Sequence, residues 1–165
     1  MTRLLAFPHE YVIIDIEMTG LDTDKDSIIE IAGLRVISDK VEDTFSSLVQ
    51  PKEYHLKEEI SALTGITDEM LSAAPDFSTI SEKLTSFIGT LPLVGHNILI
   101  DIQFLNKTML EYGYSPLDND YVDTLQLARM CLPRLGHHRL VDLADRILLA
   151  WRGYTDEAAF IFAET

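Results

Sequence analysis

An apolar run that ends abruptly in two carboxylates constrains this chain more than any other feature. Residues 11–20 read YVIIDIEMTG, and the first four are hydrophobic or β-branched. Such a run predicts a strand that is buried on both faces. Asp15 and Glu17 then follow at a spacing of two, which on a strand places both side chains on one face, roughly 6.5 to 7 Å apart. The end of this strand therefore brings two negative charges into one space.

Two carboxylates in one space resist ionising together unless a cation lies between them. A hard divalent metal ion offsets this cost, so the pair is a candidate metal site. The alternative is a strand end that emerges into solvent, where acidic residues are common. Thr19 and Gly20 favour a site, because a small hydroxyl residue and a glycine allow backbone amides to approach an anionic ligand beside the carboxylates.

The length of 165 residues predicts a single domain, residues 1–165, with a substantial core. Hydrophobic residues make up 47%, but no apolar run approaches the roughly eighteen residues that span a bilayer, and no signal segment is evident. These features predict a soluble, cytoplasmic protein without a membrane partner. The single cysteine, Cys131, excludes an intramolecular disulfide and a thiolate cluster, and we expect it to be a packed small hydrophobe.

The charge balance limits how this chain can bind nucleic acid. Its formal net charge is −14, from 27 acidic against 13 basic residues, which argues against a broad electrostatic footprint on a nucleic-acid backbone. Nucleic acid is not excluded, because metal ions in a small pocket invert the local field and allow an acidic protein to hold one strand end. Most of the acid excess is expected to be a solvated surface.

The remaining pattern predicts an α/β domain with a mixed sheet. Turn residues 38–40 separate two strands, so a hairpin is expected over residues 27–50. Leu56, Ile60 and Leu63 recur at helical spacing before Gly65, which is expected to cap that helix. Further strands are expected at 91–94 and from 121, and further helices at 67–71, 76–89, from 101, within 121–129, and at 140–149 and 156–164.

Polar residues follow two of these strands. His96 and Asn97 come directly after strand 91–94, and Asp101 lies four residues beyond Asn97 at the start of an amphipathic helix. His96 is expected to brace the strand-to-helix turn or to contact substrate rather than to act as a base. Asn97 is expected to be a turn or cap residue and is also a candidate for a substrate contact. Asp123 is typical of a helix N-cap.

Three motifs, in this order, resemble those of the DEDD exonucleases. They are D-x-E-x-T-G at the end of the first strand, L-T-G-I-T-D-E-M near the middle, and G-H-N-x-x-x-D after strand 91–94. The likeness extends from residue 11 to about residue 145 and is greatest to the epsilon-type proofreading exonucleases of bacterial DNA polymerase III and to helicase-linked exonuclease domains. It implies a ribonuclease-H-like fold, with a mixed five-stranded sheet flanked by helices, and a phosphodiesterase that removes nucleotides from a 3′ end.

The resemblance also implies a set of site residues. Two Mg²⁺ or Mn²⁺ ions would be held by the acidic residues of the motifs, with Asp15 bridging both ions. Met18 stands where the family often has Thr. The implied metal-binding and catalytic residues are Asp15, Glu17, Asp101 and Asp156, and the implied substrate-binding residues are Met18, Thr19, Gly20, Leu21, His96 and Asn97.

The third motif departs from the family pattern H-x-x-x-x-D, in which the histidine is the general base. Residues 151–159, WRGYTDEAA, fit it with Asp156 in the aspartate position, but Trp151 then occupies the place of the histidine. A literal H-x-x-x-x-D exists at His137 and Asp142, in the helix that normally precedes the motif.

Two functions follow from this departure. The first is an active metal-dependent exonuclease on single-stranded 3′ ends, with DNA favoured over RNA and a DNA polymerase or helicase as a possible partner. The second is a degenerate nucleic-acid-binding module with little or no turnover. A phosphatase or another ribonuclease-H-like nuclease is a more distant alternative. The retained Asp15, Glu17 and Asp101 favour the enzyme.

Overall fold

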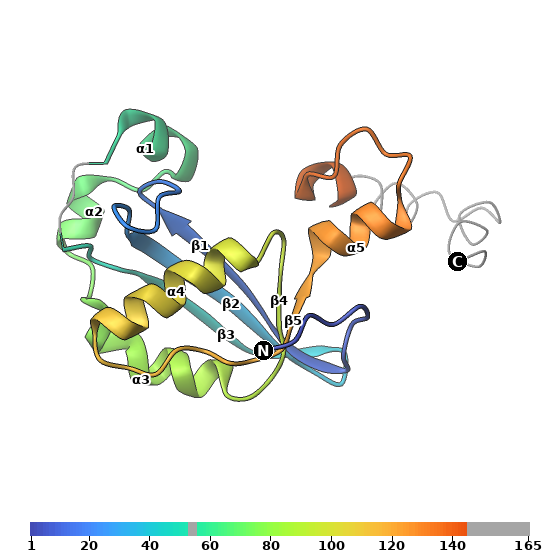
Figure 1. Ribbon diagram of the computed structural model, residues 1–165. Coiled ribbons are helices and arrows are strands. Elements are labelled where there is room, and N and C mark those ends of the chain that lie inside the picture. The colour runs from blue at the N-terminus through green and yellow to red at the C-terminus, as the bar shows by residue number, and fades with distance from the viewer. Residues whose placement is uncertain (53–55, 145–165) are drawn as a thin grey trace.

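A five-stranded mixed sheet forms the centre of the fold (Figure 1). The computed structural model describes residues 1–52 and 56–144. The strand order is β3-β2-β1-β4-β5, with β1 antiparallel to β2 and parallel to β4, and β4 parallel to β5. This arrangement confirms the predicted mixed sheet. The strands are β1 (Glu10–Met18), β2 (Ile28–Ile37), β3 (Lys40–Leu48), β4 (Leu93–Gly95) and β5 (Tyr121–Asp123).

The predicted hairpin joins β2 to β3. Ser38 and Asp39, between the two strands, have φ angles of 49° and 62°. Two consecutive residues with positive φ give a tight connection whose twist matches that of the flanking strands. The hairpin therefore holds β3 in register beside β2, and β2 in turn lies against the long strand β1.

Helices cover the sheet and lie at its ends. Figure 1 shows α4 lying across the sheet, α1 and α2 at one end, and α5 at the other. Thr67 and Asp76 cap the N-termini of α2 and α3 with their side chains, and Gly65, with φ of 75°, ends α1. The helices are α1 (Glu58–Thr64), α2 (Asp68–Ser72), α3 (Phe77–Ile88), α4 (Leu99–Glu111) and α5 (Thr124–Cys131), and residues 140–144 are also helical.

The main core lies on one face of β1. Val12, Ile14 and Ile16 are buried there together with the apolar sides of α3 and α4. The expected stripe of α3, made by Ile80, Leu84, Phe87 and Ile88, is buried in this cluster. The opposite face of β1 is only partly covered, since Ile13 is half-buried and Asp15 is exposed. The expectation that the strand is buried on both faces was therefore wrong for this second face.

The start of β2 contributes apolar residues to two separate clusters. The register shifts between Glu17 and Met18, so that Met18 pairs with Ile28. Ile28 belongs to the main core, whereas its neighbour Ile29 packs with Ile66 and Leu71 in a smaller cluster beside α1 and α2. Ile29 therefore joins the sheet to the segment of these short helices.

Two apolar residues of the helices, Leu63 and Cys131, lie on the surface. Leu63 is 81% exposed, because α1 contacts the smaller cluster only through partly buried residues such as Ile60. Cys131 is also exposed, at the last residue of α5, so the expectation of a packed thiol was wrong. A single short helix with one supporting neighbour cannot bury every residue of an apolar repeat.

Residues 2–4 extend the sheet beside β5. The N–H of Leu4 donates to the carbonyl of Tyr121 at 2.7 Å, and the N–H of Tyr121 donates to the carbonyl of Thr2 at 3.0 Å. The N–H of Thr2 donates to the carboxylate of Asp120. This segment therefore covers part of the outer edge of β5.

Among residues 1–52 and 56–144, no helix has the length and apolar character needed to cross a membrane.

Candidate active site

The carboxyl ends of β1, β4 and β5 meet at one edge of the sheet because these strands are parallel. β1 is the point at which the sheet changes from antiparallel to parallel pairing. In open α/β sheets, ligands bind beyond the carboxyl ends of strands at such a change of direction. The chain places acidic and polar side chains there, at the end of each of the three strands.

Asp15 and Glu17 lie on the same face of β1, as their spacing predicts. Although Asp15 is exposed as a residue, its carboxyl is partly withdrawn from water, and this desolvation raises its pKa against the lowering effect of His96. Desolvation also raises the pKa of Glu17, and the charges of Asp15 and Glu30 add to that increase. The two carboxylates therefore repel each other, and keeping both of them charged in this position costs free energy.

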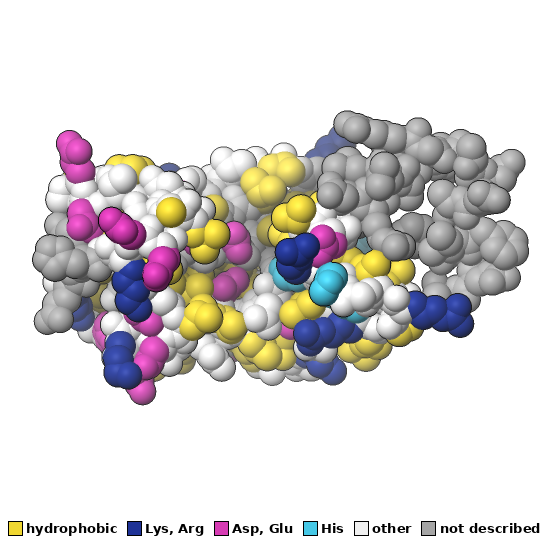
Figure 2. Space-filling view, turned by 90° about the horizontal axis from the view of Figure 1, so that it is seen from above, with side chains coloured by type: hydrophobic (Ala, Val, Ile, Leu, Met, Phe, Trp, Pro, Cys, Tyr) yellow, Lys and Arg dark blue, Asp and Glu magenta, His cyan; other side chains and the backbone are white. Residues whose placement is uncertain are grey.

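Asp101 joins this pair from the first turn of α4. It is only 7% exposed, and burial followed by the charges of Asp15, Glu17 and Asp123 raises its pKa to about 8. Three carboxylates from β1 and α4 thus share one electrostatic site. Figure 2 shows acidic side chains in the middle of this face, with hydrophobic side chains around them.

The turn between β4 and α4 places His96 and Asn97 beside these carboxylates. Asn97 has a φ of 63°, and its N–H donates to the carboxylate of Asp123 at 3.0 Å. The same carboxylate accepts from the N–H groups of Leu125 and Gln126 at the start of α5, which confirms Asp123 as an N-cap. Asp123 therefore fastens the turn to α5.

His96 braces the same turn. Its Nδ1 lies 3.1 Å from the hydroxyl of Thr124, and that hydroxyl donates to the carbonyl of Gly95 at 3.2 Å. A Cβ at Gly95 would lie 2.9 Å from the carbonyl oxygen of Ile14, so only glycine allows this close approach of β4 to β1. His96 therefore braces this turn, and its effect on the pKa of Asp15 places it near the acidic site. A contact between His96 and substrate stays a prediction.

The segment after β1 provides fewer free amides than the sequence predicted. The N–H of Thr19 donates to the carbonyl of Ser27 at 2.9 Å, so this amide is not available to an anionic ligand. Within the described contacts, the N–H groups of Gly20 and Leu21 have no protein partner. Leu21 is 75% exposed, and Met18 is half-buried against the main core. Residues 20 and 21 are therefore the part of this segment open to a ligand.

The donor chemistry of the site fits a hard divalent cation. Asp15, Glu17 and Asp101 offer only carboxylate oxygens, and burial raises the pKa of each of them. A bound cation would favour their charged forms and relieve the repulsion that adds to the raised pKa values of Glu17 and Asp101. Among residues 1–52 and 56–144, however, no group of three or more His, Cys, Asp or Glu side chains is close enough to hold a metal ion as the side chains stand. Asp156, the fourth implied ligand, and Trp151 lie outside the described residues.

The literal H-x-x-x-x-D at His137 and Asp142 has a different environment. The carboxylate of Asp142 accepts two hydrogen bonds from Arg139, at 2.8 and 3.0 Å. These bonds hold the pKa of Asp142 below its usual range, in contrast to the raised pKa values of Asp15, Glu17 and Asp101. Asp142 thus forms a local ion pair with Arg139 and does not share the raised pKa of the carboxyl groups in the acidic site.

Sequence reasoning did not single out Glu30. It lies directly opposite Glu17 in the β1–β2 pairing, and its charge raises the pKa of Glu17. The available signal was an acidic residue inside an otherwise apolar strand, I-I-E-I-A. Its relation to Glu17 depends on the register between two strands, which the residue pattern alone does not specify.

A mixed sheet with convergent carboxylates at the end of its central strand is typical of metal-dependent nucleases of the ribonuclease-H-like fold. The exonuclease family model, RNase_T, matches residues 12–153, and the chain belongs to this family. This confirms the resemblance to DEDD exonucleases on which the site was predicted.

The relatives that match this chain include DNA polymerase III proteins of several bacteria. It is 37% identical over 145 residues to the PolC-type DNA polymerase III of Bacillus cereus, covering 88% of this chain and 10% of that protein. It is 36% identical over 135 residues to the DNA polymerase III epsilon subunit of Aquifex aeolicus, covering 82% of this chain and 66% of that subunit. The chain thus spans about a tenth of the PolC-type relatives.

Solved structures confirm the fold. The E. coli exonuclease I complex with a dT13 oligonucleotide has a TM-score of 0.66 at 21% identity, covering 75% of this chain and 30% of the other. The metal-free E. coli exonuclease I complex with single-stranded DNA has a TM-score of 0.67 at 19% identity, covering 78% of this chain and 31% of the other. The predicted ribonuclease-H-like fold was correct.

Proposed function

We propose that this chain acts as a single 3′–5′ exonuclease domain that hydrolyses the terminal phosphodiester bond of single-stranded DNA with divalent metal ions. The observation that carries the proposal is the convergence of Asp15, Glu17 and Asp101 at the carboxyl end of the central strand. Burial raises the pKa of each carboxyl, the charge of Asp15 adds to the increase at Glu17, and the charges of both add to the increase at Asp101. Such a site gains most from a ligand that neutralises several carboxylates together.

The residues of the site have separate roles in this proposal. Asp15, Glu17 and Asp101, with Asp156, would hold two Mg²⁺ or Mn²⁺ ions. Bound there, the ions would activate water and stabilise the charge that develops on the phosphate. The free N–H groups of Gly20 and Leu21 can donate to a phosphate or base of the terminal nucleotide. His96 and Asn97, which Thr124 and Asp123 fix in the turn after β4, are the further residues proposed to contact the substrate.

The distribution of positive charge supports a polyanionic substrate. Residues 124–144 contain Arg129, Arg134 and Arg139 against one acidic residue, although the whole chain has a net charge of −14. All three arginines are exposed. Figure 2 shows Lys, Arg and His side chains beside the acidic centre of this face. A strand whose 3′ end enters the acidic site could therefore place its backbone over α5 and the segment that follows.

The choice of DNA and of a polymerase partner is supported by the comparisons. The curated relatives are DNA polymerase III proteins, and one structural neighbour holds a dT13 oligonucleotide. We therefore propose DNA over RNA as substrate, a DNA polymerase over a helicase as partner, and the cytoplasm as the location.

The direction of degradation can be tested with labelled single strands. We expect a 3′-label to be released at once as a mononucleotide and a 5′-label to give a descending ladder, with Mg²⁺ or Mn²⁺ present. Excess chelator should stop both, because the donor set contains only hard oxygen ligands. Products resolved on a denaturing gel provide the measurement. Degradation that continues in chelator, or that removes the 5′-label first, would contradict the proposal, and binding without turnover would indicate the degenerate module.

Metal binding should also stabilise the fold. A ligand present at about 100 times its Kd stabilises the folded state by about 2.7 kcal/mol, which corresponds to roughly 5–10 °C in Tm for a domain of this size. We expect Mn²⁺ to raise the Tm of the wild type by about this amount in differential scanning fluorimetry. The Asp15→Asn variant serves as the comparison, and an equal rise in that variant would show that the ion binds elsewhere.

A further inference from the structure

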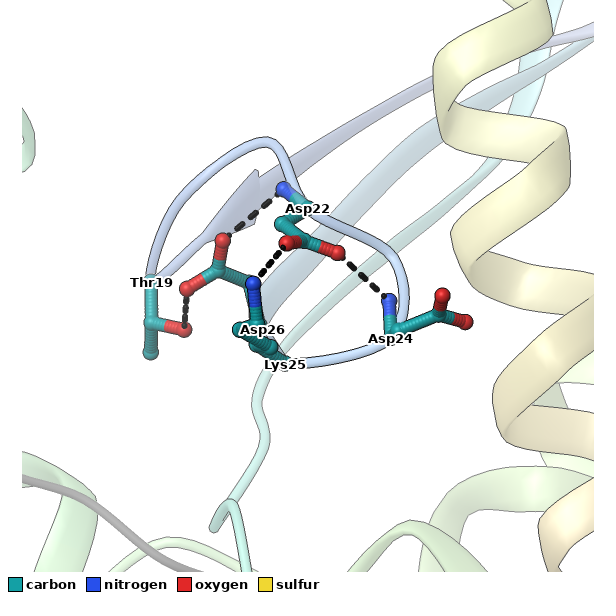
Figure 3. A network of polar contacts seen from close by, with 5 residues as sticks. All are labelled: Thr19, Asp22, Asp24, Lys25 and Asp26. Carbon is teal, nitrogen blue, oxygen red and sulfur yellow. Dashed lines mark hydrogen bonds and ion pairs between the residues drawn. The ribbon is translucent and has the colours of Figure 1, made fainter.

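The loop between β1 and β2, residues 19–27, is held together largely by its own carboxylates (Figure 3). The side chain of Asp22 accepts from the N–H of Asp24 at 3.1 Å and from the ammonium of Lys25 at 2.8 Å. The carbonyl of Asp22 also accepts from the N–H groups of Lys25 and Asp26. These bonds close the outer turn of the loop.

Asp26 connects this outer turn to the end of β1. One of its oxygens accepts from the hydroxyl of Thr19 at 3.2 Å, and the other accepts from the N–H of Asp22 at 2.8 Å. Its carboxylate therefore bonds to the residues on both sides of Gly20 and Leu21. The hydroxyl of Thr19 in turn accepts from the N–H of Ser27 at 3.0 Å, so the base of the loop is closed as well.

The absence of a side chain at Gly20 makes room for this carboxylate. A Cβ at that position would lie 2.6 Å from Cγ of Asp26, which is closer than real Cβ contacts. The carboxylate of Asp26 thus packs directly against the backbone of Gly20. Glycine here accommodates an internal side chain, in addition to any close approach of a ligand that the sequence suggested.

Asp26 is also attached to the helix that carries Asp101. The ammonium of Lys107 in α4 lies 3.5 Å from the carbonyl oxygen of Asp26 and 3.3 Å from the carboxylate of Glu111. The loop therefore has one connection to β1, through Thr19, and one to α4. These are the two elements that provide Asp15, Glu17 and Asp101.

We propose that Asp26 is a positioning residue that fixes the backbone of Gly20 and Leu21 in the conformation that receives the terminal nucleotide. The inference rests on the proposed function, because it assumes that the nucleotide contacts these residues. Asp26 touches neither substrate nor metal in this scheme. It acts through Thr19 and Asp22, and its loss should weaken substrate binding more than the chemical step.

The test compares Asp26→Asn with Asp24→Asn. Both remove one negative charge from the same loop, but the side chain of Asp24 points away from the network and accepts no hydrogen bond within the described residues. An amide at position 26 can accept at only one of its two atoms, so Asp26→Asn should keep at most one of the two accepted bonds. Both contacts also lose the charge of the carboxylate and should become weaker. We expect KM for a labelled oligothymidylate to rise by about 10-fold or more, with kcat within about three-fold of wild type. Asp24→Asn should leave both parameters unchanged.

A second variant keeps the inference testable if Asp26→Asn folds poorly. Thr19→Val leaves Asp26 in place and removes the hydroxyl that Asp26 holds, so by itself it should raise KM with kcat little changed. Where Asp26→Asn folds, the two substitutions also form a double-mutant cycle. If Asp26 acts through Thr19, the double variant should be less impaired than the product of the two single effects. Assays run well below the Tm of each variant separate this coupling from instability.

The outcomes distinguish this inference from the proposed function. A wild type without exonuclease activity would reject the proposed function itself. An active wild type with equal KM values for Asp26→Asn and Asp24→Asn would overturn the positioning role alone. A fall in kcat at unchanged KM would also overturn it, because Asp26 would then act on the chemical step. If the effects of Asp26→Asn and Thr19→Val on KM multiply in the double variant, the inference that Asp26 acts through Thr19 is rejected.

Discussion

Asp15→Asn is expected to lower the rate of 3′-end hydrolysis by at least about 10³-fold while leaving the fold intact. Removal of a single group that stabilises transition-state charge typically costs about 10²- to 10³-fold, and Asp15 is proposed to contact both metal ions. Because the Asp15 carboxyl is desolvated and adds to the repulsion on Glu17 and Asp101, its loss should not lower the Tm of the metal-free protein. Single-turnover rates and thermal melts in chelator measure the two effects.

Asp24→Asn is the matched control for this variant as well. It removes one carboxylate from an exposed position in the adjacent loop, and its rate should equal that of wild type. If Asp15→Asn retained a rate within ten-fold of wild type, Asp15 would not be a metal ligand. A lower Tm in chelator would instead identify it as a structural aspartate.

Asp101→Asn is expected to make the metal-free protein more stable than wild type, and the advantage should grow with pH. The pKa of Asp101 is raised from 3.8 to about 8 in the folded state. The stability that the neutral carboxyl contributes is fully present below the pKa of Asp101 in the unfolded state. It is lost as the pH rises through the higher pKa of Asp101 in the folded state. Between about pH 4 and pH 8, the free energy of unfolding of the wild type should therefore fall relative to that of Asp101→Asn. Each kcal/mol of this difference corresponds to about 2–4 °C in Tm.

Thermal melts of both proteins in chelator across this pH range provide the measurement. Asp76→Asn is the control, because the stability that Asp76 contributes should depend on pH in the opposite direction. Hydrogen bonds from Ser78 and Tyr112 lower the pKa of Asp76, so its contribution is present above the unfolded pKa and is lost as the pH falls. Asp76→Asn should thus be less stable than wild type at neutral pH. Parallel pH profiles for wild type and Asp101→Asn would contradict the raised pKa.

Turnover of Asp101→Asn should fall by about 10²-fold or more.

The parts of this structure that could be predicted depend on signals within a few residues. The hairpin turn, the cap at Gly65 and the N-caps at Asp76 and Asp123 each follow from local backbone chemistry. The acidic site could be predicted because the end of a strand and the start of a helix each carry their carboxylates in short motifs.

The features that were missed depend on contacts between distant segments. The register shift between Glu17 and Met18 arises from the pairing of β1 with β2. Glu30 acts on Glu17 only through that register. The role of Asp26 depends on a loop folding back on Thr19. The exposure of Leu63 and Cys131 depends on which neighbours the short helices have, which periodicity does not reveal.

Residues 2–4 also limit how this domain can associate with another protein. By bonding to the backbone of Tyr121, they occupy the outer edge of β5 that a strand from another chain would need. The other edge of the described sheet is β3, where Lys40, Glu42 and Asp43 are exposed and oppose pairing with a second strand. A partner protein is therefore expected to contact this domain through side chains on its helices and loops and not by extending its sheet.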